Sequence, residues 1–151
     1  MAITKLVSDS LGACAGGKVL QVVTATDATQ RSTTSTTFVT ASNTLSVNIT
    51  PSASSSKILL TISTSTYAAN GVDGLLTVYR DSTDLGNSNR GFQVNGGDDA
   101  HIVGSTFSVL DSPNTTSQIT YQAYIHGVSG YAMTMNYGGS KGTIIAMEIA
   151  G

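Results

Sequence analysis

A period-two alternation of apolar residues with serine and threonine runs from residue 17 to residue 151 and constrains this chain more than any other feature. Glycine, asparagine, aspartate or proline interrupts the alternation at short intervals. Such an alternation places successive side chains on opposite faces of a strand and buries one face. No window shows the 3.6-residue apolar stripe and capping residues of an amphipathic helix. The pattern therefore predicts an all-β chain.

The alternation is clearest over residues 57–66, where Ile58, Leu60 and Ile62 share one face. Many short strands separated by turn residues are typical of an antiparallel sandwich, a jelly roll or a barrel, and we expect roughly 8–10 strands. We also expect residues 1–17 to form an N-terminal attachment arm and residues 18–151 to form one head domain. Comparable alternation occupies residues 19–24, 45–50, 76–79, 102–110, 119–125, 131–137 and 144–150.

The chain is poor in charge. Only 11% of its residues are charged and the formal net charge is −2, whereas soluble domains carry about 25% charged residues. Its seven lysines and arginines are scattered singly, which argues against nucleic acid because phosphate binding needs clustered cations. A neutral surface of serine and threonine suits a chain that packs against copies of itself. The composition favours a coat, fibre or adhesin over a freely diffusing enzyme.

The N-terminal segment does not resemble a secretion signal. Asp9 interrupts the apolar stretch that a signal peptide requires, and no apolar run approaches the roughly 20 residues of a membrane helix. Cys14 is the single cysteine, so an intrachain disulfide is impossible. We therefore expect a protein made in the cytoplasm and not inserted into a membrane. The candidate docking residues of the arm are Ile3, Leu6, Val7 and Leu11.

Candidate catalytic and metal-binding groups are sparse. His101 and His126 are the two histidines, and neither lies in a recognisable catalytic motif. Asp98 and Asp99 are adjacent, and neighbours on a strand point to opposite faces, unlike the paired carboxylates of a glycosidase. Together with His101 they supply oxygen and nitrogen ligand types for a cation where three copies meet, but the calcium-loop spacing is absent and an ordinary surface loop is favoured. We expect no catalytic residue, metal or cofactor.

Carbohydrate recognition remains open from the sequence. Sugars bind to aromatic rings flanked by amide and hydroxyl groups, and the same residues also pack half-buried on strands. The residues of these types are Tyr67, Tyr79, Tyr124, Tyr131 and Tyr137, together with Asn87, Asn89 and Asn95.

Glu148, the single glutamate, interrupts the apolar final strand. A buried unpaired carboxylate is costly, so this side chain should face solvent, pair with a cation or lie at a subunit interface. We expect it to point outward, opposite Ile145, Met147 and Ile149.

Several short segments occur in a characteristic order along the chain, namely 17–23, 49–51, 56–60, 76–81, 110–113, 119–125 and 142–149. Together they resemble a family of small structural proteins from the virions of tailed bacteriophages. The resemblance covers about residues 17–151 and implies a jelly-roll head like those of the C1q and tumour-necrosis-factor group, assembled as a homotrimer. Such heads form knobs on tail fibres, head fibres or capsid decorations, and no catalytic residue of the family carries over.

The predicted function is thus that of a non-enzymatic virion structural protein, attached to the particle through its N-terminal arm. Its expected partners are its own copies, other virion proteins of head or tail, and a host surface glycan. The alternative is a carbohydrate-binding, receptor-recognising module of a tail fibre or a bacterial adhesin. The candidate residues of an exposed recognition loop are Asn87, Asn89, Arg90, Asn95, Asp98 and Asp99.

Overall fold

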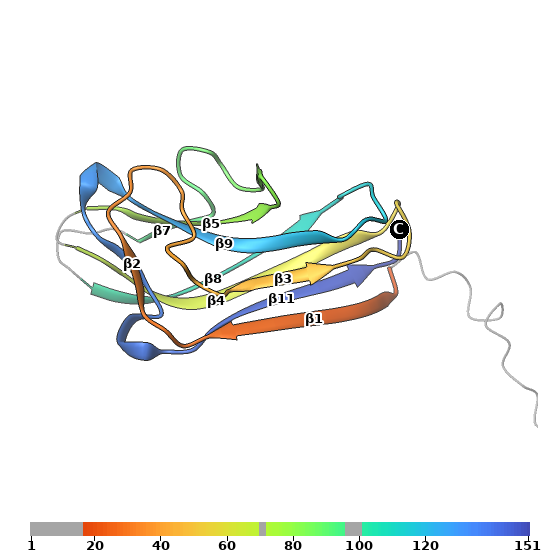
Figure 1. The fold of residues 1–151 in the computed structure, drawn as a ribbon, viewed down its shortest axis with the longest axis horizontal. Coiled ribbons are helices and arrows are strands. Elements are labelled where there is room, and N and C mark those ends of the chain that lie inside the picture. Colours follow the sequence, from red (N-terminus) through yellow and green to blue (C-terminus); the bar gives the residue numbers. More distant parts are fainter. Residues whose placement is uncertain (1–16, 70–71, 96–100) are drawn as a thin grey trace, which may run out of the picture.

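The computed structural model describes residues 17–69, 72–95 and 101–151, which form two antiparallel sheets packed face to face (Figure 1). The arm residues Ile3, Leu6, Val7 and Leu11 lie outside this part of the chain. The six-stranded sheet contains β1 (Val19–Asp27), β2 (Arg31–Thr33), β4 (Lys57–Ala68), β8 (His101–Asp111), β10 (Met133–Met135) and β11 (Gly142–Ile149). The five-stranded sheet contains β3 (Ser46–Ile49), β5 (Gly74–Arg80), β6 (Thr83–Asp84), β7 (Gln93–Asn95) and β9 (Ile119–Gly127).

The connectivity of the strands is that of a jelly roll. The order β1-β11-β4-β8 in one sheet faces the order β3-β9-β5-β7 in the other, so the chain wraps back and forth between the sheets as a doubled Greek key. Strands β2, β6 and β10 are short additions at the sheet margins. The prediction of an all-β antiparallel jelly-roll sandwich is confirmed.

The core lies between the sheets and follows the alternation in the sequence. On β4, Ile58, Leu60 and Ile62 are completely buried, whereas the intervening Leu59 and Thr61 are only partly buried on the outer face. Full burial of such a side chain contributes roughly 1.5–3 kcal/mol. The other large, fully buried side chains of the core include Leu45, Leu76, Tyr121, Ile125, Met133, Met135 and Ile144.

The segment 131–137 departs from the predicted continuous strand. Only Met133–Met135 is extended and paired, as β10. A 3-10 turn, η2 (Val128–Gly130), precedes it, and Asn136 with φ 53° begins the turn that contains η3 (Tyr137–Gly139). Asparagine adopts the left-handed region more readily than other side chains because it hydrogen-bonds locally. The strand therefore ends where Asn136 turns the backbone.

Strand β11 alternates as predicted, but the expectation for Glu148 is wrong. Ile145, Met147 and Ile149 do share a face, which is the outer, partly exposed one. Glu148 lies on the core side with Ile144 and is fully buried. No helix within the described residues is long and apolar enough to cross a bilayer.

Candidate functional site

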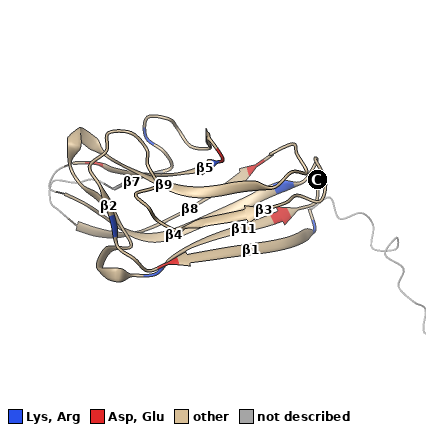
Figure 2. Ribbon diagram, viewed as in Figure 1, with Lys and Arg blue, Asp and Glu red and all other residues tan. Residues whose placement is uncertain are grey.

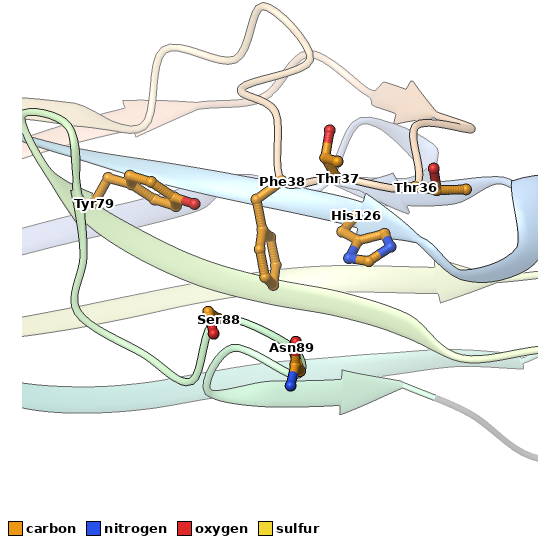
Figure 3. Close-up of a pocket in the computed structure, with 7 residues that line it drawn as sticks. All are labelled: Thr36, Thr37, Phe38, Tyr79, Ser88, Asn89 and His126. Carbon is orange, nitrogen blue, oxygen red and sulfur yellow. The ribbon is translucent and has the colours of Figure 1, made fainter.

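A cavity of about 420 Å³ opens on the outer face of the five-stranded sheet (Figure 3). Its walls come from three parts of the chain: the segment before the Val39 bridge, the outward side of β5 and β9, and the loop 85–92. No lysine, arginine, aspartate or glutamate lines it. The lining residues are Thr36, Thr37, Phe38, Tyr79, Ser88, Asn89 and His126.

Strand alternation places the floor of the cavity. Val78 and Ile125 are completely buried, so their neighbours Tyr79 and His126 point to the opposite, outer side of the sheet. Val39 is paired with Ile125 through backbone hydrogen bonds of 2.9 and 2.8 Å. This pairing fixes the adjoining Phe38 over the sheet.

The rings around the cavity are in contact with one another. Phe38 lies 5.2 Å from the His126 ring in an edge-on arrangement and 6.5 Å from the Tyr79 ring at 59°. Tyr124 stacks on Tyr79 with centroids 4.1 Å apart. These distances are typical of attractive aromatic pairs, and Figure 3 shows the Phe38 ring between Tyr79 and His126. The cavity therefore has a preorganised aromatic wall.

The loop 85–92 is anchored at both ends to β5. Leu85 donates its backbone N–H to the Val78 carbonyl at 3.0 Å, and Phe92 donates to the Leu76 carbonyl at 3.0 Å. Gly91 has φ 63°, and a Cβ there would lie 2.6 Å from the Leu76 carbonyl oxygen. Only glycine fits this close approach without strain. The loop is thus held firmly enough to present its tip to the cavity.

Asn87 and Asn89 have different roles within this loop. The Asn87 side chain accepts a hydrogen bond from the Asn89 backbone N–H at 2.9 Å, which shapes the turn. The Asn89 side chain lines the cavity, and no hydrogen-bond partner for its amide occurs among the residues the structure describes. Its carbonyl and NH2 are therefore free to act as acceptor and donor.

His126 contributes a neutral imidazole. Burial lowers the pKa of this histidine, so the ring is uncharged at neutral pH. Its Nδ1 is buried with no hydrogen-bond partner in the described part of the chain. A buried N–H without an acceptor is costly, which favours the tautomer whose proton is on Nε2. Nε2–H is then the donor available to the cavity.

The structure brings only part of the predicted recognition loop to this site. Asn89 lines the cavity, Asn87 is used within the loop, and Arg90 is paired with Asp73 at the surface. The Asn95 side chain, Asp98 and Asp99 lie outside the described residues.

The tyrosines divide between the two sides of the sandwich. Tyr79 lines the cavity, and Tyr124 stacks on the Tyr79 ring without lining the cavity itself. Tyr67 stacks on Tyr137 beside the six-stranded sheet, 4.9 Å apart, and the exposed Tyr131 does not line the cavity. Phe38 and His126 were not predicted as site residues, because neither lies in a motif and only tertiary packing brings them together.

The buried Glu148 is a structural group. Its carboxylate accepts hydrogen bonds from Gln21 Nε2 at 2.6 Å and from the Ser52 backbone N–H and hydroxyl at 2.7 and 2.6 Å. Burial alone would raise the pKa of Glu148, but the hydrogen bonds from Ser52 and Gln21 outweigh it and lower the pKa to about 2. The carboxylate stays ionised because neutral donors surround it.

A second buried carboxylate, on β8, lies in the same register row as Glu148, on the other side of Ile58. Asp111 accepts hydrogen bonds from one Arg80 guanidinium nitrogen, 2.9 Å from each carboxylate oxygen, and from the Tyr121 hydroxyl at 2.6 Å. Burial, together with the hydrogen bond to Asp111, raises the pKa of Tyr121, so the hydroxyl remains a donor. The group ties β5, β8 and β9 together.

The Asp27 carboxylate also has a structural role. Burial would raise its pKa, but hydrogen bonds from the backbone N–H groups of Thr44 and Thr29, at 2.9 and 2.8 Å, lower it. Within the described ranges, no three His, Cys, Asp or Glu side chains converge as a metal site. The aspartates at 98–99 lie outside those ranges, while His101 is exposed at the start of β8.

The opposite side of the sandwich carries a different feature, an exposed row of apolar side chains. Val22, Met147, Leu59 and Leu110 lie in register across β1, β11, β4 and β8, and Ile149 adjoins them on β11. Val22 is 53% and Leu110 is 51% exposed. We call these five residues the apolar strip. Figure 2 shows little charge along the central lengths of these strands.

Comparisons with known proteins assign no family. No family model matches the chain, and no curated protein matches its sequence. Among solved structures, the chain is similar to that of T=1 particles derived from infectious bursal virus, at 18% identity and a TM-score of 0.44, covering 87% of this chain and 36% of the viral one.

The VP2 subviral particle of infectious bursal disease virus gives 17% identity and a TM-score of 0.42, covering 86% of this chain and 37% of the viral one. The chain thus spans just over a third of the viral chains. With both TM-scores below 0.5, this likeness does not establish a function for it.

Proposed function

We propose that this chain is a non-enzymatic structural protein of a bacteriophage virion, a homotrimeric jelly-roll head that residues 1–17 attach to the particle as a fibre knob or decoration. The proposal joins the resemblance of residues 17–151 to small virion proteins with one structural observation. That observation is the apolar strip, which supports assembly because it is a contiguous row of partly exposed apolar side chains.

The strip crosses four strands as an uninterrupted apolar row. Exposed apolar side chains scattered singly are ordinary, whereas a contiguous row usually marks an interface. Val22 and Leu110 stand at its two ends, and Met147 and Leu59 fill the space between. Burial against a partner would remove this apolar surface from water, at about 25 cal/mol per Å².

Another copy of the chain is the occupant that best suits this face. The row beside the strip consists of Thr24, Ile145, Thr61 and Ser108, which add no charge. Lys57, which pairs with Ile149 at one end, is the charged residue beside the strip among the described strands. A face with so little charge offers little complementarity toward a charged partner and meets its own copy with little repulsion. Closed rotational symmetry would then bury the strip of every subunit.

The carboxylates support a non-enzymatic role. Glu148, Asp111 and Asp27 are each buried and held by hydrogen bonds that stabilise the fold. Apart from the local bond from Thr29 to Asp27, their donors come from other strands and loops, as expected for cross-links within a rigid head.

Native mass spectrometry and light scattering test the assembly. We expect the full chain to be a trimer and the double variant Val22→Lys/Leu110→Lys to be a monomer. Circular dichroism should show that the double variant is folded. Asn48→Lys, an exposed change on the other sheet, is the control and should leave the trimer intact. A wild-type monomer at micromolar concentration, or a double variant that remains trimeric, would overturn the proposal.

Virion incorporation tests attachment separately. Deleting residues 1–16 should leave the trimeric head folded but remove it from purified particles. Unchanged incorporation would refute the docking role of the arm while leaving the assembly result standing.

A further inference from the structure

We propose that the cavity between Phe38, Asn89 and His126 is a binding site for a neutral sugar ring. The inference concerns the outer face of the five-stranded sheet and does not depend on how the chain assembles. It extends the general possibility of sugar binding to a defined site whose chemistry selects an uncharged ligand.

The size and shape of the cavity fit a small ligand. Its volume of about 420 Å³ lies within the roughly 300–1,000 Å³ of pockets that bind small molecules. The walls come from the 36–38 segment, β5, β9 and the loop 85–92, and backbone hydrogen bonds anchor two of these walls to the sheet. A site held in this way needs little ordering when it binds.

The aromatic wall matches the apolar side of a pyranose. One face of a sugar ring carries C–H groups, which pack against the face of an aromatic ring. Phe38 and Tyr79 supply such rings, and Tyr124 and His126 hold them in place through ring contacts of 4.1 and 5.2 Å. The same rings in a purely apolar pocket would favour an apolar ligand. The polar groups of the cavity therefore decide which class of ligand it binds.

Those polar groups fit sugar hydroxyls, each of which donates and accepts. The Asn89 amide provides both functions, the Ser88 hydroxyl provides both, and His126 provides its Nε2–H. Figure 3 shows Ser88 and Asn89 on the side of the Phe38 ring away from Thr37. A sugar packed on that ring therefore has hydrogen-bonding groups within reach of its edge.

The charged groups near the cavity supply no unpaired cation. Asp84 Oδ1 accepts hydrogen bonds from the Thr77 hydroxyl at 2.7 Å and from the Gly86 backbone N–H at 2.9 Å, while its Oδ2 is buried without a hydrogen-bond partner in the described part of the chain. Arg90 is paired with Asp73. With a neutral imidazole at His126, the site offers no cation to an acidic sugar. It should therefore prefer uncharged hexoses to sialic or uronic acids.

The position of the site also suits a protein displayed on a particle. It lies on the opposite side of the sandwich from the apolar strip, because Tyr79 and His126 point outward from the five-stranded sheet. Assembly through the strip would leave the cavity open to solvent.

Ligand-observed NMR with the full chain tests the proposal, using glucose, galactose, mannose and N-acetylglucosamine as probes and N-acetylneuraminic acid as the charged comparison. We expect saturation transfer to at least one neutral sugar and none to the acid. Asn89→Ala should weaken binding roughly tenfold, the loss expected for one hydrogen bond, and Phe38→Ala should abolish it.

Tyr131→Ala is the matched control, because it removes an exposed aromatic ring that does not line the cavity. It should leave binding unchanged. Asn89 is exposed, so its variant is expected to fold, which circular dichroism checks. Absence of transfer to every neutral sugar, equal binding of the acid, or unchanged binding in Asn89→Ala would each overturn the proposal. The strip double variant should still bind the sugar, which separates this result from the assembly test.

Discussion

Replacing Glu148 with glutamine should remove a large electrostatic contribution to the fold. The lowering of its pKa from 4.5 to about 2 corresponds to about 3 kcal/mol of preferential stabilisation of the ionised carboxylate, at about 1.4 kcal/mol per pKa unit. The side chain itself is fully buried, but its donor Ser52 is exposed and Gln21 is half-buried, so solvent screens part of this contribution. In the variant an amide N–H would also face Gln21 Nε2, itself a donor. We expect Glu148→Gln to lower the free energy of unfolding by about 2–3 kcal/mol at pH 7.

The pH dependence has a defined sign. The pKa of Glu148 is lower in the folded chain than in the unfolded chain, so unfolding takes up a proton at acidic pH. The stabilisation is complete above the unfolded pKa near 4.5 and disappears as the pH falls to about 2. The difference between wild type and variant should therefore shrink across this interval.

Urea denaturation at several pH values between 7 and 2.5 measures this difference. Ser52→Ala should cost about 1–2 kcal/mol, because it removes one hydroxyl donor to the carboxylate. Ser54→Ala, an exposed change in the same loop, should cost almost nothing. A loss below 0.5 kcal/mol for Glu148→Gln at pH 7, or a loss that does not vary with pH, would refute the reasoning.

Four further substitutions probe the packing, again by urea denaturation. Leu60→Ala should cost about 2–5 kcal/mol because Leu60 is completely buried, whereas Leu59→Ala on the outer face should cost clearly less; equal losses would contradict the assigned faces. Tyr121→Phe should cost about 1–3 kcal/mol through the lost hydrogen bond to Asp111, and a neutral result would show that this bond contributes little. Gly91→Ala should cost more than about 1 kcal/mol and weaken sugar binding, since its Cβ would meet a carbonyl oxygen; unchanged stability would show that the loop is not anchored there.

Much of the fold could be predicted from local patterns. The alternation of Ile58, Leu60 and Ile62 predicted both the existence of β4 and its buried face, and these three residues are buried. The segment 131–137 shows the limit of the method, because its alternation is regular while left-handed Asn136 ends the strand. A side-chain pattern reports preferred faces and does not report where the backbone turns.

The candidate sites were less accessible to sequence reasoning. Asn89 was predicted as an exposed recognition residue and does line the cavity, but Phe38 and His126 carried no sequence signal. They are 88 positions apart in the chain (126 minus 38), and the Val39–Ile125 bridge together with the hydrogen bond from Gly127 N–H to the Ser35 carbonyl brings them together. The apolar strip likewise depends on the register between strands, which cannot be read from the sequence.

The sequence by itself determined that this chain is built of strands with one apolar face each, because a period of two leaves no other regular structure able to bury that face. It did not determine which of two similar faces would be buried. On β11 both faces are largely apolar, and the packing of the second sheet selected the face that includes Glu148. That choice was possible because Gln21 and Ser52, distant in sequence, donate hydrogen bonds to the carboxylate. Tertiary structure thus decided which face of β11 is buried, where the cavity lies and which side chains form the apolar strip, since each depends on contacts between segments far apart in the chain.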